Sequence, residues 1–144
     1  MPAIEGQLTD RRLILRIAIA ATAPAQWPPA FPTSFEQCNG LLDSGATRFA
    51  VSTRLVQALA LPVVGRRAVA SARGENMHDL YMIRIGLYGV GANTMPAYPH
   101  FLDGAFEVID WADHPRFDVL IGMDVISLCE LNLRRTGAFR LDVP

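Results

Sequence analysis

The chain has 144 residues, the size of one ordinary domain, and its 51% hydrophobic and 19% charged residues exclude a disordered chain. Its 13 basic and 14 acidic side chains give a net charge of -1, which excludes the strong basic field that attracts nucleic acid or an acidic membrane. Two cysteines are too few for a disulfide scaffold, and no apolar run approaches the roughly 20 residues that span a bilayer. We expect one domain over residues 1–144, with no nucleic-acid partner and no membrane span.

The N-terminal region imitates a secretory signal, because Arg11-Arg12 precede an apolar stretch rich in small residues. However, Arg16 interrupts that stretch, and the acidic residues Glu5 and Asp10 lie where a signal should be basic. The sequence therefore favours a folded N-terminus over a cleaved signal, and we expect a cytoplasmic protein.

A strand accounts better for the same region. Apolar residues recur at every second position from Leu13 to Ile19, which is typical of a strand with one core-facing side. Residues 3–8 are a candidate partner strand, connected through a turn at Thr9-Asp10. The sequence thus predicts a hairpin at the start of the domain.

Residues 21–34 contain four prolines, which donate no backbone N–H, so this stretch is predicted to be a loop. Strand character returns over 35–43 and again over 48–51. Ser52 is a typical N-cap for a short helix over 53–59, which Pro62 ends.

The remainder of the chain alternates short apolar runs with turn signals. Strands are predicted over residues 63–71, 80–88, 106–111, 117–121, 131–133 and 139–143, and a short helix over 123–128. A polar turn at 72–76 separates the first two of these strands. Many short strands with little helix predict a mainly antiparallel β domain, either a closed or a sandwiched barrel.

The segment Gly40-Leu41-Leu42-Asp43-Ser44-Gly45-Ala46-Thr47 carries the chemical signal. Two leucines bring an aspartate to the end of a buried strand, and Ser-Gly then makes a tight turn. The tripeptide alone is also typical of a surface Asx-turn. Its context decides between the two interpretations, because Leu120-Ile121-Gly122 follows about 75 residues later, just before the second short helix.

This order resembles the retropepsin-like (retroviral-type, single-lobe) aspartic proteases. Their pattern is two apolar residues, Asp, Thr or Ser, Gly, Ala, and Ser or Thr, followed by a short helix, a flap hairpin, and then two apolar residues with Gly before another helix. The resemblance covers roughly residues 4–133, and its most specific element is Leu41–Thr47. It implies the closed barrel of that family, with the hairpin around residues 72–76 as the flap.

The resemblance assigns roles residue by residue. Asp43 matches the catalytic aspartate, and Ser44 matches the hydroxyl residue that bonds across the dimer axis in the family. Gly45 and Ala46 match positions whose backbone lines the substrate cleft. The segment Ala72-Arg73-Gly74 lies where the flap tip, and hence a further substrate contact, is expected.

The chain contains a single Asp-Ser/Thr-Gly, whereas the mechanism of the family needs two carboxylates that share a proton and activate a water. One chain supplies one carboxylate, so we expect a C2 homodimer with Asp43 of each chain at the axis. The resemblance therefore implies an endopeptidase that cleaves peptide or protein substrates on the acid side of neutral, without a metal or another cofactor.

The sequence leaves a second interpretation open: a catalytically inactive, dimeric module that binds a peptide or a protein on the same fold. The flap tip has a single glycine beside Arg73 and Glu75, and residues 21–34 and 91–115 are longer than a minimal viral enzyme needs. These insertions can cover the cleft, extend the dimer contact or lie on the surface.

Other motifs are weak. The three histidines, His78, His100 and His114, have no metal-ligand spacing. Cys38 and Cys129 are predicted to be buried thiols, with a disulfide possible only if their Cα atoms lie within about 7 Å.

Overall fold

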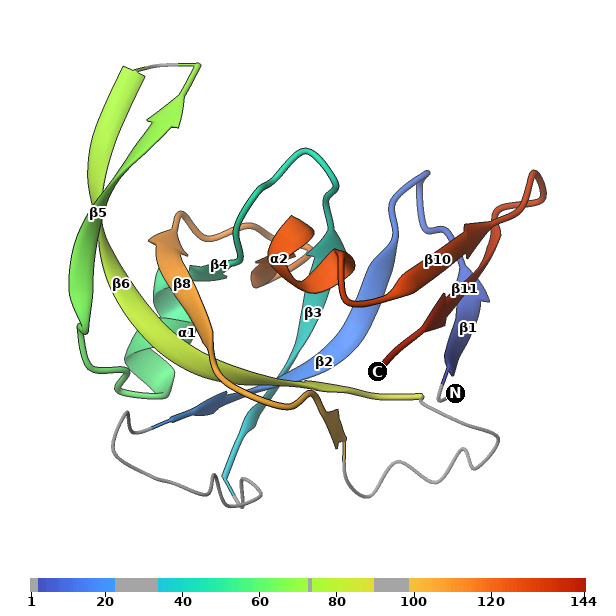
Figure 1. Cartoon of the computed structure of the whole chain (residues 1–144), viewed down its shortest axis with the longest axis horizontal. Coiled ribbons are helices and arrows are strands. Elements are labelled where there is room, and N and C mark those ends of the chain that lie inside the picture. The colour runs from blue at the N-terminus through green and yellow to red at the C-terminus, as the bar shows by residue number, and fades with distance from the viewer. Residues whose placement is uncertain (1–2, 23–33, 73, 90–98) are drawn as a thin grey trace.

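The computed structural model describes residues 3–22, 34–72, 74–89 and 99–144 (Figure 1). In this part of the chain, eleven strands and two short helices occur. The strands are β1 (Ala3–Gln7), β2 (Ile14–Ala21), β3 (Glu36–Leu42), β4 (Ala50–Ser52), β5 (Gly65–Ser71), β6 (Gly74–Leu87), β7 (His100–Phe101), β8 (Phe106–Trp111), β9 (Val119–Ile121), β10 (Glu130–Leu133) and β11 (Ala138–Asp142). The helices are α1 (Thr53–Ala58) and α2 (Met123–Ile126). The predicted mainly β class is confirmed.

The larger sheet closes on itself. Its strand order is β2-β3-β9-β4-β8-β6-β5, and β6 also pairs with β2, which completes a ring of six strands. Two pairings in the ring are parallel, β3 with β9 and β4 with β8, whereas the other pairings of this sheet are antiparallel, as predicted for a mainly antiparallel domain. In each of these pairs one strand, β9 or β4, is only three residues long, and its partner strand lies far away in the sequence.

The smaller sheet joins the two ends of the chain in the order β1-β11-β10. The predicted N-terminal hairpin is therefore wrong in its pairing, although both strands exist. A tight turn does form, because Thr9 and Arg12 exchange backbone hydrogen bonds of 2.8 and 2.9 Å. Beyond that turn the strands diverge: β1 pairs with β11 over five residues, and β2 enters the barrel.

The core fills the barrel. Ile17 and Ile19 of β2 and Ile83 and Ile85 of β6 have no exposed surface, as their alternation predicts. The opposite face of β2 is also buried, because Ala18 lies in a second small cluster with Tyr88 and Phe101. The small alanine side chains allow the aromatic rings to lie close to this face of β2. The alternation of large apolar residues in the sequence indicates the main core only, and not this second cluster.

Helix α1 begins as predicted. The buried Ser52 accepts a hydrogen bond of 3.3 Å from the Leu55 N–H through its side-chain oxygen, and Leu55 packs into the core. This cap satisfies one of the free donors at the start of the helix. Neither helix of the described part of the chain has the length and hydropathy needed to cross a membrane.

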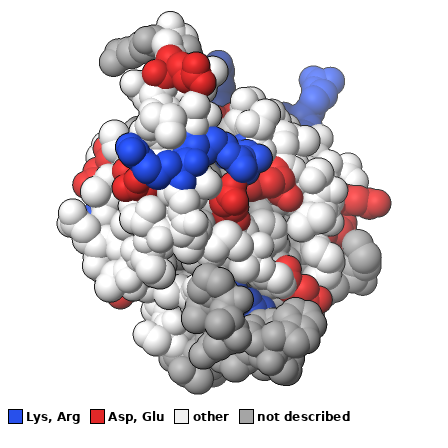
Figure 2. Space-filling model, turned by 60° about the vertical axis from the view of Figure 1, so that its left-hand side comes forward, with Lys and Arg blue, Asp and Glu red and all other residues white. Residues whose placement is uncertain are grey.

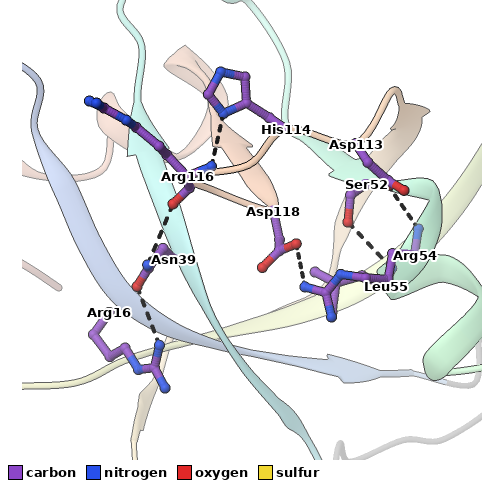
Figure 3. A network of polar contacts seen from close by, with 9 residues as sticks. All are labelled: Arg16, Asn39, Ser52, Arg54, Leu55, Asp113, His114, Arg116 and Asp118. Carbon is purple, nitrogen blue, oxygen red and sulfur yellow. Dashed lines mark hydrogen bonds and ion pairs between the residues drawn. The ribbon is translucent and has the colours of Figure 1, made fainter.

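A polar network holds the segment before β9 against β3 and α1 (Figure 3). Arg54 forms an ion pair with Asp118, and its backbone N–H donates to Asp113. Asn39 of β3 donates to the Arg116 carbonyl. The described part of the predicted 91–115 insertion thus consists of β7, β8 and a segment bound to the barrel; residues 90–98, like 23–33 of the other insertion, lie outside the described residues.

Candidate active site

The aspartate motif follows the central strand β3. Gly40, Leu41 and Leu42 pair in parallel with Val119, Leu120 and Ile121 of β9. The Asp43 backbone N–H continues this ladder and donates to the Ile121 carbonyl over 3.0 Å. The sequence segments 40–43 and 119–121 therefore lie side by side, and the position of Asp43 is fixed by backbone hydrogen bonds to a buried strand.

A tight turn directs the carboxylate of Asp43. The Gly45 N–H donates to Asp43 Oδ1 over 2.8 Å, and the Ala46 N–H donates to the Asp43 carbonyl over 3.1 Å. Asp43 is half-buried, while Ser44 and Gly45 are exposed. The motif is thus an Asx-turn, and it leaves Asp43 Oδ2 without a protein donor among the described residues. The geometry offers a carboxylate that is held at one oxygen and open at the other.

The start of α2 holds the far end of this turn. The Met123 N–H donates to the Ala46 carbonyl over 2.8 Å, and Asp124 Oδ2 accepts from the Phe49 N–H over 3.2 Å. A Cβ atom at Gly122 would lie 2.6 Å from both the carbonyl carbon and the carbonyl oxygen of Arg48. Only glycine permits this close approach of two backbones. The loop 43–49 is therefore held at three points by residues 122–124.

The hairpin of β5 and β6 extends from the same side of the barrel (Figure 1). Its strands pair from Gly65 with Leu80 to Ser71 with Gly74, and Gly74 has a φ of 110°. In Figure 1 the hairpin tip and the loop that follows β3 both lie along the upper edge of the molecule.

Ion pairs connect the loop to the base of the hairpin. Glu107 of β8 accepts from Arg48, which follows the aspartate motif, over 2.8 Å, and from Arg67 of β5 over 3.1 Å. Figure 2 shows a band of basic side chains across one face of the molecule, with acidic side chains beside it. Each partner is at least one third exposed, so each pair contributes no more than about 1 kcal/mol. The pairs orient the two elements rather than stabilise the fold.

The comparison with solved structures shows the fold. The crystal structure of a retropepsin-like aspartic protease from Rickettsia conorii matches with a TM-score of 0.56 and 13% identity, over 98% of this chain and 93% of that chain. The fold is that of the retropepsin-like aspartic proteases. The foamy viral protease-reverse transcriptase in complex with an RNA/DNA hybrid matches with a TM-score of 0.51 and 15% identity, over 85% of this chain but only 13% of that larger chain. The sequence itself matches no family model and no curated protein.

The retropepsin-like fold brings only some of the expected site residues together. Asp43, Ser44, Gly45 and Ala46 form one turn, as described above. Ala72 and Gly74 are exposed at the tip of the hairpin of β5 and β6, which is a separate element from that turn; Arg73 lies outside the described residues.

Asp124 is the site residue that the sequence interpretation missed. Its carboxylate accepts from the Phe49 N–H and, over 3.0 Å, from the Val125 N–H. Burial raises the pKa of Asp124 above its ordinary value of 3.8, although these N–H donors act in the opposite direction. An acidic residue directly after the start of a helix was the available signal, but it is common for reasons unrelated to a site.

The raised pKa of Asp124 predicts a pH-dependent stability. A carboxyl group with a higher pKa in the folded state binds its proton more tightly there, so the protein loses stability as the pH rises from 3.8 through the folded pKa. We expect the melting temperature of the wild type to fall relative to that of Asp124→Asn as the pH rises above 3.8. Thermal unfolding of both proteins at several pH values measures this difference, and parallel curves would refute the assignment.

The cysteines and histidines form no site within the described residues. Both cysteines are free, and burial raises the pKa of the Cys38 thiol to about 12, so it stays protonated. No group of three or more His, Cys, Asp or Glu side chains that could hold a metal occurs in the described part of the chain. His78 contacts Asp110, and His114 stacks on Phe117 with ring centroids 4.0 Å apart.

Proposed function

We propose that this protein is an aspartic endopeptidase whose active site forms at the two-fold axis of a homodimer. The observation that carries the proposal is the Asp43 carboxylate, which the Gly45 N–H holds at one oxygen at the end of a strand of the retropepsin-like barrel. The other oxygen has no protein donor within the described residues. It is available to a water molecule and to the Asp43 carboxyl group of a second copy.

In the proposed dimer the two Asp43 side chains share one proton. Two carboxylates about 3 Å apart cannot both ionise easily, so the pair titrates as a unit and holds one proton over a range of acidic pH. The ionised partner removes a proton from a bound water, which attacks the carbonyl carbon of the peptide. The protonated partner donates its proton to the carbonyl oxygen, which gives a tetrahedral diol. The proton taken from the water then passes to the amide nitrogen, the C–N bond breaks to release the amine, and a hydroxyl proton of the diol returns to the pair as the product carboxyl group forms.

The surroundings of Asp43 fit this role. The Ser44 side chain is exposed and makes no hydrogen bond within the described part of the chain, so its hydroxyl can bond to the second copy. Gly45 and Ala46 present backbone at the proposed cleft. The hairpin tip at Ala72–Gly74 would cover an extended substrate, which would bond to the protein as an added strand does. A peptide or a protein segment in extended conformation is therefore the proposed substrate.

The test is cleavage of a diverse peptide library by the purified protein from acidic to neutral pH, with the Asp43→Asn variant in parallel. Cleavage by the wild type that the variant lacks would support the aspartic mechanism and would give the side-chain preferences. A folded, dimeric wild type that cleaves nothing at any pH would refute it and would favour the inactive peptide-binding module.

A further inference from the structure

Two basic side chains share one acidic partner close to the active-site loop. Glu107 of β8 pairs with Arg48 over 2.8 Å and with Arg67 over 3.1 Å, both through the same carboxylate oxygen. One carboxylate neutralises only one of the two guanidinium charges, so one positive charge is left over. Every other arginine ion pair of the described residues has at least one acid for each arginine. The excess is therefore specific to this cluster of Arg48, Arg67 and Glu107.

The neighbouring acids are engaged elsewhere. Asp124, the other acid close to Arg48, accepts from two backbone N–H groups and lies in no ion pair of the described residues. On the side of the hairpin, Asp79 of β6 pairs with Arg66, and Asp110 of β8 contacts a histidine of β6. No second carboxylate of the described chain therefore pairs with the cluster.

The cluster connects the active-site loop with the hairpin. Arg48 is five residues after Asp43, in the loop that residues 122–124 hold, and Arg67 is on strand β5. Glu107 is near the start of β8, which lies between β4 and β6 in the sheet order. In the proposed function an extended substrate lies between the Asp43 loop and the hairpin, so it runs past both guanidinium groups.

The side chains of the cluster are open to a ligand. Val108, next to Glu107 on β8, is only 1% exposed, and successive residues of a strand point to opposite faces, so Glu107 points away from the core. The side chains of Arg48 and Arg67 are 46% and 39% exposed. Each guanidinium has five N–H donors in a planar fork that matches a carboxylate, and the contact with Glu107 does not use all of them.

We propose that Arg48 and Arg67 form a subsite for an acidic side chain, Asp or Glu, of the peptide substrate. The substrate carboxylate balances the charge that Glu107 leaves over and accepts hydrogen bonds from the exposed guanidinium donors. The subsite rests on the proposed function, which places the peptide beside Asp43. It narrows the substrate class from any extended peptide to one with an acid near the cleaved bond.

The length of the chain limits where that acid lies. Five residues span at most about 18 Å, which bounds the separation of Arg48 from Asp43. An extended substrate rises about 3.3 Å per residue, so the acid lies within about five residues of the cleaved bond. In the proposed dimer the two-fold axis repeats the subsite, so an acid is favoured at one position on each side of that bond.

Matched substrates test the preference. Peptides that the library shows to be cleaved are made with Glu, and separately with Gln, at each position in turn. We expect kcat/KM at low salt to be about fivefold higher for Glu than for Gln at one position on each side of the cleaved bond. The difference should shrink in 1 M salt, which screens exposed charges. Equal rates for Glu and Gln at every position would overturn the subsite.

Two substitutions of similar shape separate a subsite from a purely structural ion pair. Arg67→Gln removes the excess charge, so the preference for Glu should disappear. Glu107→Gln keeps an oxygen that accepts from Arg48 but frees both positive charges, so the preference should rise to about tenfold or more. Arg66→Gln is the matched control, because Arg66 is the neighbouring residue on β5 and pairs with Asp79 instead; it should keep the wild-type preference. A preference that both first variants change in the same direction, or that Arg66→Gln also removes, would contradict the assignment.

A binding measurement lets the two proposals fail separately. The Asp43→Asn variant is titrated with fluorescein-labelled decapeptides of Ala, Ser and Leu that carry one Glu, or one Gln, at each position in turn, and fluorescence anisotropy gives the dissociation constants. Tighter binding of Glu peptides that Glu107→Gln strengthens and Arg67→Gln removes, by a protein whose wild type cleaves nothing, supports the subsite and refutes the protease. Cleavage that depends on Asp43 but shows no preference for Glu in rate or in binding supports the protease and overturns the subsite.

Discussion

Replacing Asp43 by asparagine is expected to lower kcat/KM for peptide cleavage about a thousandfold or more without unfolding the protein. The substitution removes the group that would take a proton from the attacking water, and such proton transfer contributes up to about 10⁴-fold. The side-chain oxygen of asparagine can still accept from the Gly45 N–H, so the turn is preserved. Stability should therefore change by less than about 0.5 kcal/mol, as measured by urea unfolding.

Asp103→Asn is the matched control for this substitution. Asp103 also precedes a glycine and is exposed, but it follows β7 and lacks the hydroxyl residue of the motif. This variant should cleave peptides like the wild type. If Asp43→Asn kept more than a tenth of the activity, or if both variants lost activity equally, Asp43 would not be the catalytic carboxylate.

Mixed dimers extend the same prediction to the second carboxylate. When wild type and Asp43→Asn are unfolded together in equal amounts and refolded, about a quarter of the dimers carry two aspartates. If both copies must supply Asp43, the activity falls to about a quarter, whereas independent sites in each chain would retain half. Titration of the variant fraction distinguishes a quadratic from a linear decrease.

The order of elements could be predicted from the sequence because local signals mark it. Alternation of apolar residues locates β2 and β6, and Ser52 caps α1 as its residue type indicates. The pairing of strands could not be predicted in the same way. The Thr9–Arg12 turn satisfies every local rule for a hairpin, yet β1 pairs with β11, which lies more than 130 residues away in the sequence. Contacts at such separations depend on how the whole chain collapses, which no short window contains.

The same distinction between local signals and long-range contacts applies to the candidate site. The Asp43 turn is a local motif, and its main hydrogen bonds connect residues two or three positions apart, so the sequence reveals it. The residues that hold this turn are not local. Asp124 accepts from the backbone N–H of Phe49, which is 75 positions earlier. Because the donor is a backbone group, the residue type at position 49 does not indicate the hydrogen bond. Gly122 was identified through the resemblance, but the reason for it appears only in the structure.

Gly122→Ala is expected to destabilise the fold by about 3 kcal/mol and to lower peptide cleavage at least tenfold. The backbone of Gly122 is extended, with a φ of -92°, so alanine adopts it without strain. The cost is steric, because the added methyl group would lie 2.6 Å from the Arg48 carbonyl group and 2.9 Å from the Ala46 oxygen. These are backbone atoms, which cannot rotate away as a side chain can, and overpacking of this kind costs about 1–3 kcal/mol or more.

The expected loss of activity has the same cause, a displacement of the Arg48 backbone by the added methyl group. Moving the Arg48 backbone away from α2 breaks the hydrogen bonds from Met123 to Ala46 and from Phe49 to Asp124. The turn that orients Asp43 would then lose its far anchor, and a misplacement of about 1 Å at a reacting group can cost about a hundredfold in rate. Urea unfolding and steady-state cleavage, measured on the same preparation, separate the loss of stability from the loss of rate in the folded fraction.

Gly65→Ala is the control for the general effect of adding a methyl group to a glycine in a strand. A Cβ atom at Gly65 would meet only Leu80 Cδ1, at 3.5 Å, which is an ordinary contact. We expect this variant to unfold within about 0.5 kcal/mol of the wild type and to keep its activity. Equal behaviour of the two alanine variants would mean that the close approach of residues 122 and 48 does not hold the active-site loop, and the site would then depend on the Asx-turn of Asp43 alone.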